Sequence, residues 1–572
     1  MNVKLMSPFW LAGSAAMLSI AWLLPNHTPP WLTFHSDAWA ATVIAMVSLW
    51  VLGKSKTNAG WHVLTLAIGF CTVIPWVQYA CGLNTSFGNA WINSIYMLGC
   101  LCVMKVGEKW ETDTPGQSYD FIFIAVMVAT IVSIGIQLRQ WAGLEPIGFW
   151  TIRSITNSRY YANLAQPNEL ASLELLGLVG CSWGFYRQKL SASIAIILSS
   201  FILIGIVLTE SRTAMLNMIL LVMMVILFRQ KLPSKKYLWV VISLTCYFFA
   251  ITLLIPMLNN GNDSGIPELR APAVSERLLA WRIFINASLE QPVWGFGWGQ
   301  LTRAYFLLVG NYPDRSGLFS QSHNLLLDII LWNGYPIGLL LISVLIWWTW
   351  KVITSIHNFH QIHALAFVMV LGTHAMLEFP LQYAYFLLPF GLMVGSIQSS
   401  IGLKTIWNEK KWMNLILSAI AISMLSITVR DYFRAETSMY GLRFQHYKIQ
   451  TTIPATPPDV LALTQFHDSI LFARNTPKRY LKPEELQWMR DTVNAMPSPL
   501  LIYKLIVNLA LNHHPEEAEH WIVILRKTSP EISFEDMRKL WDVSVLSMPE
   551  LAAVKWPISM MPSPTNSQMH AQ

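Results

Sequence analysis

The stretch NLLLDIILWNGYPIGLLLISVLIWWTW, Asn324 to Trp350, is apolar over almost its whole length and decides the kind of fold to expect. A run of this length can cross the hydrocarbon core of a bilayer as a helix. It is interrupted by Asn333, Gly334 and Pro336, and glycine and proline are residue types that bend or break helices. We therefore predict a helix at the membrane surface, a bend at these residues, and a membrane span after it.

Similar apolar runs recur along most of the chain. Of the 572 residues, 54% are hydrophobic and only 12% are charged, a composition that a soluble protein of this size could not keep hydrated. The sequence therefore predicts an all-α polytopic membrane protein with about 12–14 transmembrane helices. The expected spans lie at 8–24, 37–53, 61–80, 88–104, 119–137, 168–186, 190–208, 214–228, 237–257, 324–350, 362–378, 384–402 and 412–429.

Lysine sets the expected orientation. With the N-terminus in the cytoplasm, every lysine up to residue 411 falls in a cytoplasmic segment, which is the positive-inside pattern. The same count puts four loops and everything after Arg430 on the opposite side of the membrane, at 138–167, 209–213, 258–323 and 379–383. We predict that the functional face lies on this side, which is called periplasmic here because the resemblance described below implies a bacterial inner-membrane protein. The net charge of +7 follows from this loop bias and indicates no nucleic-acid partner.

The predicted periplasmic loops contain arginine but no lysine, and positive charge on that side needs a reason. Ion pairs with the loop carboxylates explain most of these arginines, the carboxylates being Glu268, Glu276, Glu290 and Asp314. Two or three arginines are expected to hold an anion instead, because the planar guanidinium binds phosphate oxygens with two hydrogen bonds and keeps its charge. Arg212, in LTESRTAMLN, is the best case, since it lies between two spans with almost no loop.

The sequence changes in character after Arg430. Charge rises, and segments such as KPEELQWMRDTVNAM read as amphipathic helices with acidic starts and basic ends. We predict a transmembrane domain over 1–429, a periplasmic helical domain over 430–560 and a disordered tail over 561–572. The short helices are similar to tetratricopeptide-type pairs, but no 34-residue period is present. A helical cap and a module that recognises a protein partner are both compatible with this region.

Polar residues able to do chemistry gather in the predicted periplasmic segments. His323 precedes the apolar run that contains Asp328, and an ionisable side chain in such a run is a functional candidate. Asn168 and Gln166 stand at a helix start, where Asn168 could simply be the cap. His374 and Glu378 are four residues apart, and their simplest interpretation is a hydrogen-bonded buried pair.

This set of residue types favours one kind of reaction. A histidine near its ordinary pKa can take a proton from a hydroxyl, and arginines can stabilise the charge on a departing phosphate. Together they suit the displacement of pyrophosphate from a sugar by an acceptor hydroxyl. No cofactor or metal site is predicted, because Cys100 and Cys102 are too close together and four ligands never assemble. The glycines at 295, 297 and 299 lack the full dinucleotide fingerprint.

Five motifs, in order, carry a resemblance to a known family. LTESRTAMLN, SERLLAWRIFINASLEQPVWGFGWG and QSHNLLLDIILWNGYPIG together resemble the core of the O-antigen ligase and polymerase superfamily. ANLAQPNELASLELL and HAMLEFPLQYAYFLLPFGL more specifically resemble bacterial protein O-oligosaccharyltransferases, which glycosylate pilins and other exported proteins. The resemblance covers roughly residues 120 to 400 and implies a fold like that of type C glycosyltransferases.

The resemblance also implies a reaction and a set of roles. The donor would be an undecaprenyl-pyrophosphate-linked oligosaccharide, and the acceptor a serine or threonine hydroxyl on an exported, pilin-like protein. His323 would be the base, and Arg277 and Arg212 would hold the pyrophosphate, without a metal. Gln166 and Tyr383 match positions of the protein-glycosylating branch, although Tyr385 is a rival for the tyrosine. We also expect Asn168, Asp328 and Glu378 to contact substrate.

Two other functions remain open on the sequence. An O-antigen ligase or polymerase would use a sugar acceptor, whereas QPNE, EFPLQYAYF and the C-terminal region favour a protein acceptor. A transporter of lipid-linked glycans should show inverted repeats and polar residues at the bilayer midplane. Here the polar candidates gather at one face of the membrane, which favours the enzyme.

Overall fold

A computed structural model describes residues 5–58, 60–144, 146–153, 159–258, 271–312, 317–453 and 456–556. The predicted ion-pair partners Glu268 and Asp314 and the predicted tail over 561–572 lie outside these residues. The described chain is helical except for one antiparallel pair of two-residue strands, β1 (Gly60–Trp61) and β2 (Trp407–Asn408). The prediction of an all-α membrane protein is therefore confirmed.

Each predicted span coincides with one helix. The thirteen helices are α1 (Pro8–Ser19), α2 (Phe34–Lys54), α3 (Val63–Ala80), α4 (Phe87–Asp113), α5 (Gln117–Trp141), α6 (Pro167–Tyr186), α7 (Ala192–Leu208), α8 (Arg212–Leu227), α9 (Lys235–Leu258), α12 (Leu325–Thr354), α13 (Phe359–Ala375), α14 (Ala384–Ser400) and α15 (Lys411–His446). By length and composition alone, 7 helices of the described chain could cross a membrane. The exact number of spans above seven stays a prediction.

Small residues let α4 and α14 pack closely in the centre of the bundle. A Cβ atom added to Gly395 would lie 1.9 Å from the backbone oxygen of Met104, and one added to Gly107 would lie 2.2 Å from that of Leu392. Gly391 stands one turn before Gly395 and faces Cys100 and Val103 of the same neighbour. Small residues four apart are a common means of close helix approach in membranes, where hydrophobicity alone does not bring helices together.

The break predicted in the opening stretch is present in α12. Gly334 has φ 73° and ψ 173°, so two helical segments meet there at a kink. The glycine turn after α10 (Ala271–Glu290) packs against this kink, and a Cβ on Gly334 would lie 2.2 Å from Val293 O. Two backbone hydrogen bonds, Phe296 N to Leu331 O and Tyr335 N to Pro292 O, join the turn to α12, each at 2.7 Å. The glycines therefore serve close packing of backbone on backbone.

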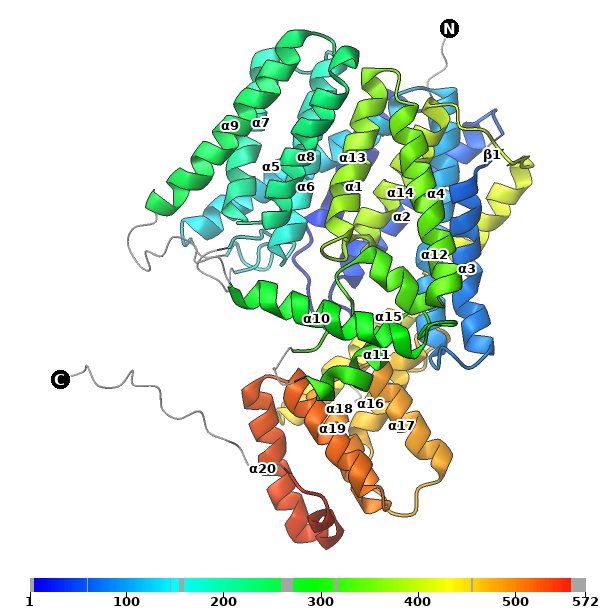
Figure 1. The fold of residues 1–572 in the computed structure, drawn as a ribbon, viewed down its shortest axis with the longest axis vertical. Helices are drawn as coiled ribbons and strands as arrows, with labels where there is room; N and C mark the ends of the chain where they lie inside the picture. Colours follow the sequence, from blue (N-terminus) through cyan, green and yellow to red (C-terminus); the bar gives the residue numbers. More distant parts are fainter. Residues whose placement is uncertain are drawn as a thin grey trace, which may run out of the picture.

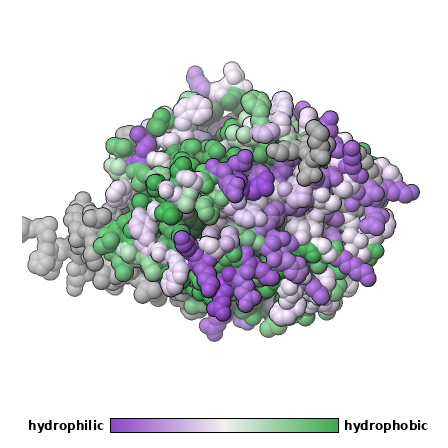
Figure 2. All heavy atoms as spheres, turned by 90° about the horizontal axis from the view of Figure 1, so that it is seen from above, coloured by the Kyte–Doolittle hydropathy of each residue, from purple (hydrophilic) through white to green (hydrophobic). Residues whose placement is uncertain are grey.

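The lysine-bearing loops and the predicted periplasmic elements lie at opposite ends of the bundle. Figure 1 shows α10, α11 (Leu301–Leu308) and the C-terminal helices at one end, and β1 at the other. Seen from the β1 end, hydrophilic side chains gather across the middle and one side of the molecule (Figure 2). This arrangement agrees with the predicted grouping of the loops. Which compartment each end faces remains a proposal.

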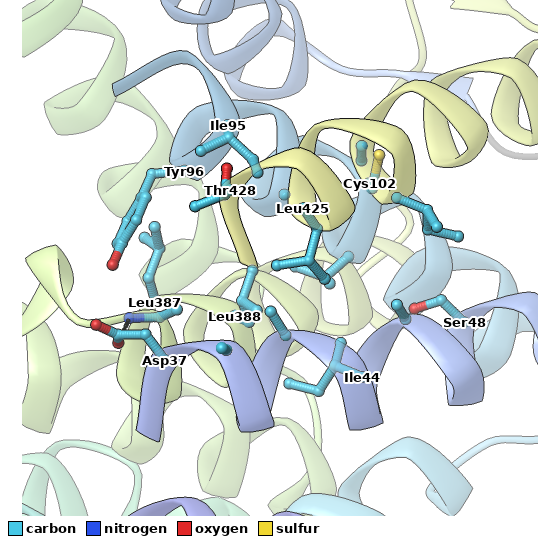
Figure 3. A pocket seen from close by; sticks show the side chains of 18 of the residues that line it. Asp37, Ile44, Ser48, Ile95, Tyr96, Cys102, Leu387, Leu388, Leu425 and Thr428 are labelled. Atoms are coloured by element: carbon cyan, nitrogen blue, oxygen red, sulfur yellow. Dashed lines mark hydrogen bonds between the residues drawn. The ribbon is translucent and has the colours of Figure 1, made fainter. Parts of the chain in front are cut away.

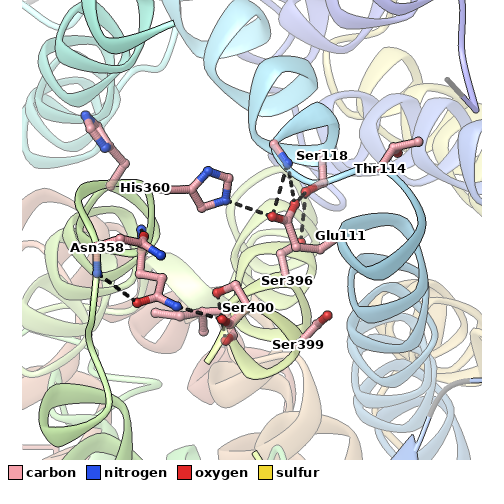
Figure 4. A network of polar contacts seen from close by, with 12 residues as sticks. Glu111, Thr114, Ser118, Asn358, His360, Ser396, Ser399 and Ser400 are labelled. Carbon is pink, nitrogen blue, oxygen red and sulfur yellow. Dashed lines mark hydrogen bonds and ion pairs between the residues drawn. The ribbon is translucent and has the colours of Figure 1, made fainter. Parts of the chain in front are cut away.

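A polar network ties helices together near the β1 end. The buried carboxylate of Glu111 accepts hydrogen bonds from the backbone N–H of Gly116 and from Ser118 Oγ, at the start of α5. His360 Nε2 of α13 lies 2.7 Å from Glu111 Oε1 (Figure 4). One side chain therefore connects α4, α5 and α13, and the carboxylate lies where the α5 dipole favours negative charge.

The C-terminal region is helical and begins without a break. Helix α15 continues to His446, well past the predicted boundary at residue 430. It is followed by α16 (Thr464–Arg474), α17 (Pro483–Ala495), α18 (Pro499–Leu511), α19 (Pro515–Thr528) and α20 (Glu531–Ser547). Leu505, Ile506, Ile522 and Leu525 are among the buried apolar residues of this region. The division into two domains remains a prediction.

Candidate active site

His323 and Glu378 meet at the end of the bundle that bears the C-terminal helices. His323 lies directly before α12 with φ 58°, a left-handed backbone conformation that turns the chain into the helix. Asn324 caps α12 by accepting from Leu327 N, and it also donates to Met376 O at 3.1 Å. This second bond holds the loop after α13 against the start of α12. His323 Nδ1 lies 2.6 Å from Glu378 Oε2 as a result.

Two further side chains converge on the same carboxylate. Arg277 of α10 donates from Nη2 to Glu378 Oε1, and Asn168 of α6 donates to the same oxygen at 3.2 Å. The Glu378 side chain is 6% exposed. Burial acts to raise the pKa of Glu378, but the hydrogen bond from His323 and the charges of His323 and Arg277 outweigh it. The net pKa therefore lies below its ordinary value, and Glu378 is a carboxylate.

The structure corrects the expected pairing of His374 with Glu378. His374 Nδ1 lies instead 2.8 Å from Ser172 Oγ, while Glu378 binds His323 and Arg277. The two residues are four apart, but α13 ends at Ala375, so Glu378 leaves the helix face that carries His374. A spacing of four residues predicts a contact in a continuous helix, and that prediction is wrong for His374 and Glu378.

A second correction concerns the start of α6. The cap is Gln166, whose side-chain oxygen accepts from Glu169 N at 2.8 Å, and not Asn168. Asn168 lies inside the first turn and is thereby free to face Glu378. Its Oδ1 accepts from Ser211 Oγ at 2.8 Å and from Arg159 Nη2 at 3.1 Å. Asn168 therefore joins α6 and the start of α8 to the carboxylate.

Arg212 is less closely placed than predicted. It is the first residue of α8 and is exposed, next to the cap residue Ser211 that binds Asn168. Within the described segments Arg212 makes no hydrogen bond or ion pair with His323 or Arg277. Arg159, which the sequence analysis did not single out, binds Asn168 and Thr209 O. Nothing in its local sequence distinguishes Arg159 from the other loop arginines.

Asp328 holds the loop that carries His323. Its Oδ1 accepts a hydrogen bond from the backbone N–H of Ser322 at 3.0 Å, and the residue as a whole is 3% exposed. The His323 ring is also flanked by two aromatic rings that the sequence analysis did not single out. Phe319 and Phe379 lie with ring centroids 5.5 and 5.1 Å from the imidazole. Two edge-on rings and one hydrogen bond together fix its orientation.

The two tyrosines of the EFPLQYAYF motif have different surroundings. Tyr383 is half-buried, precedes α14 and stacks on Tyr385 at a centroid distance of 5.3 Å. Tyr385 is fully buried, and its hydroxyl donates to Glu169 Oε2 at 2.8 Å. Tyr383 therefore faces the cavity described next, whereas Tyr385 is part of its supporting structure.

A cavity of about 770 Å³ is lined by four of the eight predicted site residues, and it adjoins His323, Arg277 and Asn168 through their contacts with Glu378. Its polar wall includes Gln166, Asp328, Glu378, Gln382 and Tyr383. Most of its remaining wall is apolar and follows α3, α4, α12 and α14, with residues such as Leu64, Ile68, Met97 and Leu345, and α4 adds Asn89 and Asn93. The C-terminal region closes it with Gln465, Phe466 and Met496. The cavity thus combines a group of polar side chains around Glu378 with an extensive apolar surface, a combination that suits a lipid with a polar head.

Metal ligands do not cluster in the part of the chain that the structure describes, where no three His, Cys, Asp or Glu side chains are placed to hold an ion. The positive groups at the site are guanidinium groups. Arg277 donates a hydrogen bond to Glu378 itself, and Arg159 donates one to Asn168, which contacts Glu378. The site can therefore offer a base, a carboxylate that orients it, and fixed positive charge.

Comparison with known families agrees with the fold and the site. A family model described as O-antigen ligase matches residues 194–343, the range that contains Arg212, Arg277 and His323. A second, described as virulence factor membrane-bound polymerase, C-terminal, matches residues 362–538, which contain Glu378 and Tyr383. The chain is thus a multi-pass membrane protein that is similar to the O-antigen ligase family over the first range and to membrane-bound polymerases over the second.

The chain is also similar to two O-oligosaccharyltransferases. It is 29% identical over 542 residues to the general O-oligosaccharyltransferase of Acinetobacter baylyi, covering 92% of this chain and 93% of that protein. It is 26% identical over 318 residues to the ComP-specific O-oligosaccharyltransferase of the same organism, covering 53% of this chain and 58% of that protein. The predicted resemblance is confirmed.

Proposed function

We propose that the protein transfers an oligosaccharide from undecaprenyl pyrophosphate to serine or threonine hydroxyls of exported proteins such as pilin. The observation that carries the proposal is the contact of His323 and Arg277 with one carboxylate, Glu378, at the polar end of an amphipathic cavity. The lysine distribution supports a periplasmic position for this end. We further propose that residues 1–429 form the ligase domain and 430–560 a periplasmic domain.

The geometry supports a division of labour between base and carboxylate. When Nδ1–H of His323 donates to Glu378, the other nitrogen, Nε2, carries the lone pair. Nε2 takes the proton of the acceptor hydroxyl while the oxygen of that hydroxyl attacks the anomeric carbon of the donor sugar. The bond from that carbon to the pyrophosphate oxygen breaks, and undecaprenyl pyrophosphate leaves with the electron pair. No step needs a general acid or a metal, because pyrophosphate is a stable anion.

Guanidinium groups supply the stabilising charge for the leaving group. Arg277 is 34% exposed at its side chain, so donors not used on Glu378 remain open to a phosphate. Arg159 and Arg212 lie on the Asn168 side of the site and extend the positive surface toward the membrane interface. Gln166 and Tyr383, on the cavity wall, are proposed to contact the donor sugar, while Asp328 and Asn168 position His323 and Glu378.

A cleft beside the cavity supports a protein acceptor. It has a volume of about 930 Å³ and lies between α16, α17 and the turn that joins α3 to α4. It shares Gln465 with the reaction cavity, and Phe87 and Trp488 line it together with Asp468 and Asp491. An extended segment of polypeptide in this cleft would reach the reaction cavity at Gln465. The names of the two relatives, one of them specific for a protein, agree with this choice.

A reconstituted reaction tests the proposal. Purified protein is mixed with undecaprenyl-pyrophosphate oligosaccharide and an exported pilin, and the pilin is measured by intact mass. The wild type is expected to add one glycan mass, and His323→Ala is expected to add none while inserting and accumulating normally. His357→Ala, an exposed histidine at the β1 end, is the matched control and should retain transfer. Normal transfer by His323→Ala would exclude the proposed mechanism.

The family descriptions also favour a second candidate, a ligase or polymerase with a sugar acceptor. Deleting the gene separates the two. A pilin that loses mass supports the protein acceptor, whereas unchanged pilin with altered lipopolysaccharide supports the sugar acceptor.

A further inference from the structure

An apolar groove runs into the membrane region from the polar end of the bundle. It is formed by α2, α4, α14 and α15, and Figure 3 shows Asp37 and Tyr96 at one end and Ser48 at the other. From Asp37 to Ser48 the groove follows α2 for about 16 Å, at the rise of an α-helix. Between these ends its walls are apolar, with Ile44, Val103 and Leu425 among them.

The groove adjoins the reaction cavity. Trp31, Tyr96 and Leu387 line both. The groove and the cavity meet beside Tyr383, because Asp37 of the groove accepts a hydrogen bond through Oδ1 from the backbone N–H of the next residue, Ala384, at 2.6 Å. A molecule with its head at Glu378 and Tyr383 would therefore pass Tyr96 to enter the groove.

Small side chains keep the groove open. Ala38, Ala41 and Ala45 of α2, Gly99 of α4 and Ala421 of α15 all line it. On α2 and α15, neighbouring positions are large, apolar and exposed, as at Met46 (57%), Leu49 (44%) and Ile420 (46%). Exposed apolar side chains on a membrane helix face lipid, so the groove lies beside the hydrocarbon of the bilayer.

We propose that this groove binds the isoprenoid chain of the lipid-linked donor while its pyrophosphate lies at Arg277. The inference rests on the proposed function, because it assigns part of the donor to a place. An unbranched slot lined by small residues suits a long, narrow hydrocarbon, and burying such a chain stabilises the complex in proportion to the apolar area covered. The rival route is the apolar part of the reaction cavity itself, beside α3 and α12.

Filling each route separately decides between them. Ala41→Phe and Ala45→Phe fill the groove, Ala67→Phe fills the rival route, and Met46→Phe places the same ring on α2 outside both. Each variant is assayed with a long-chain polyprenyl donor and with a donor of two isoprene units. The groove variants are expected to raise KM for the long-chain donor about tenfold and to leave the short-chain donor unchanged. If Ala67→Phe alone has this effect, the proposal is wrong.

A crosslinking experiment gives a readout that does not depend on transfer or on variant folding. A long-chain polyprenyl pyrophosphate with a photoreactive group in its chain is irradiated with the wild-type protein, and labelled peptides are sequenced. Labels within residues 34–54 and 411–428 support the groove, and labels confined to α3 and α12 overturn it. If the wild type transfers glycan from neither donor, the proposed function fails, while the position of the label still decides the groove.

Discussion

Nδ1 of His323 lies 2.6 Å from Oε2 of Glu378, although the two residues are 55 positions apart in the chain. A carboxylate in this position selects the tautomer of the imidazole and stabilises the imidazolium that forms when the ring takes a proton. The same carboxylate binds Arg277 through its other oxygen. Glu378 therefore couples the proposed base to the proposed anion-binding group.

Replacing Glu378 by glutamine should slow the chemical step. The amide can accept from Nδ1–H but carries no charge to stabilise the imidazolium, so we expect kcat to fall about 10- to 100-fold with a smaller change in KM. The measurement is initial rates against donor and acceptor concentration. Glu516→Gln, an exposed glutamate of α19, is the control. An unchanged kcat would separate Glu378 from the reaction.

Glu378 should also make stability depend on pH in the acid range. Because its pKa in the folded protein lies below the ordinary value of 4.5, the folded state binds this proton less readily than the unfolded chain does. The resulting stabilisation is present above the ordinary pKa and is lost as pH falls through the folded-state pKa. We expect the wild-type Tm to fall more steeply than that of Glu378→Gln between about pH 5 and pH 3. Parallel curves for the two proteins would contradict this.

Arg277→Lys keeps the positive charge but replaces the planar guanidinium, which can donate two parallel hydrogen bonds, with an ammonium group. A single ammonium cannot bind Glu378 and a phosphate with the same geometry, so we expect kcat/KM to fall at least about tenfold. Arg282→Lys, at an exposed position further along α10, should change little and is the matched control. The assay is glycan transfer at fixed protein level in the membrane. Equal losses in both variants would indicate an effect of α10 as a whole.

Substitutions of Tyr383 and Tyr385 should differ in whether they mainly change donor binding or mainly change stability. Tyr385→Phe removes the hydrogen bond to buried Glu169, which we expect to cost about 1–3 kcal/mol of stability. Tyr383→Phe leaves that bond in place and removes a hydroxyl that lines the cavity and also interacts with Glu169, so we expect a raised KM for the donor and a smaller loss of stability than in Tyr385→Phe. Thermal unfolding and transfer kinetics of both variants provide the check. The reverse pattern would exchange the roles assigned to Tyr383 and Tyr385.

The network at the β1 end should matter for stability and not for catalysis. His360→Ala leaves the buried Glu111 carboxylate without its histidine partner, and we expect a loss of about 1–3 kcal/mol. Because the network lies at the opposite end of the bundle from His323, kcat of the remaining folded protein should be unchanged. Thermal unfolding in detergent and specific activity per folded molecule test both parts. A fall in kcat at equal folded amount would be evidence against a purely structural role.

The sequence by itself determined the features that depend on short stretches of chain. Apolar runs specified the membrane helices, because a bilayer accepts only segments that are apolar and satisfy their own backbone hydrogen bonds. Gly334 specified the break in α12, and the position of His323 before an apolar helix was readable in the same way. The resemblance to the O-antigen ligase superfamily rested on motifs of this local kind.

Tertiary structure decided which side chains meet. Glu378 faces His323 and not His374 because α13 ends three residues earlier, and Asn168 reaches Glu378 because Gln166 takes the cap of α6. The glycine turn before α11 and the groove along α2 likewise depend on the packing of helices distant in sequence. Such contacts are set by the close approach of whole helices, as between α4 and α14 at Gly395, and no local pattern records the partner.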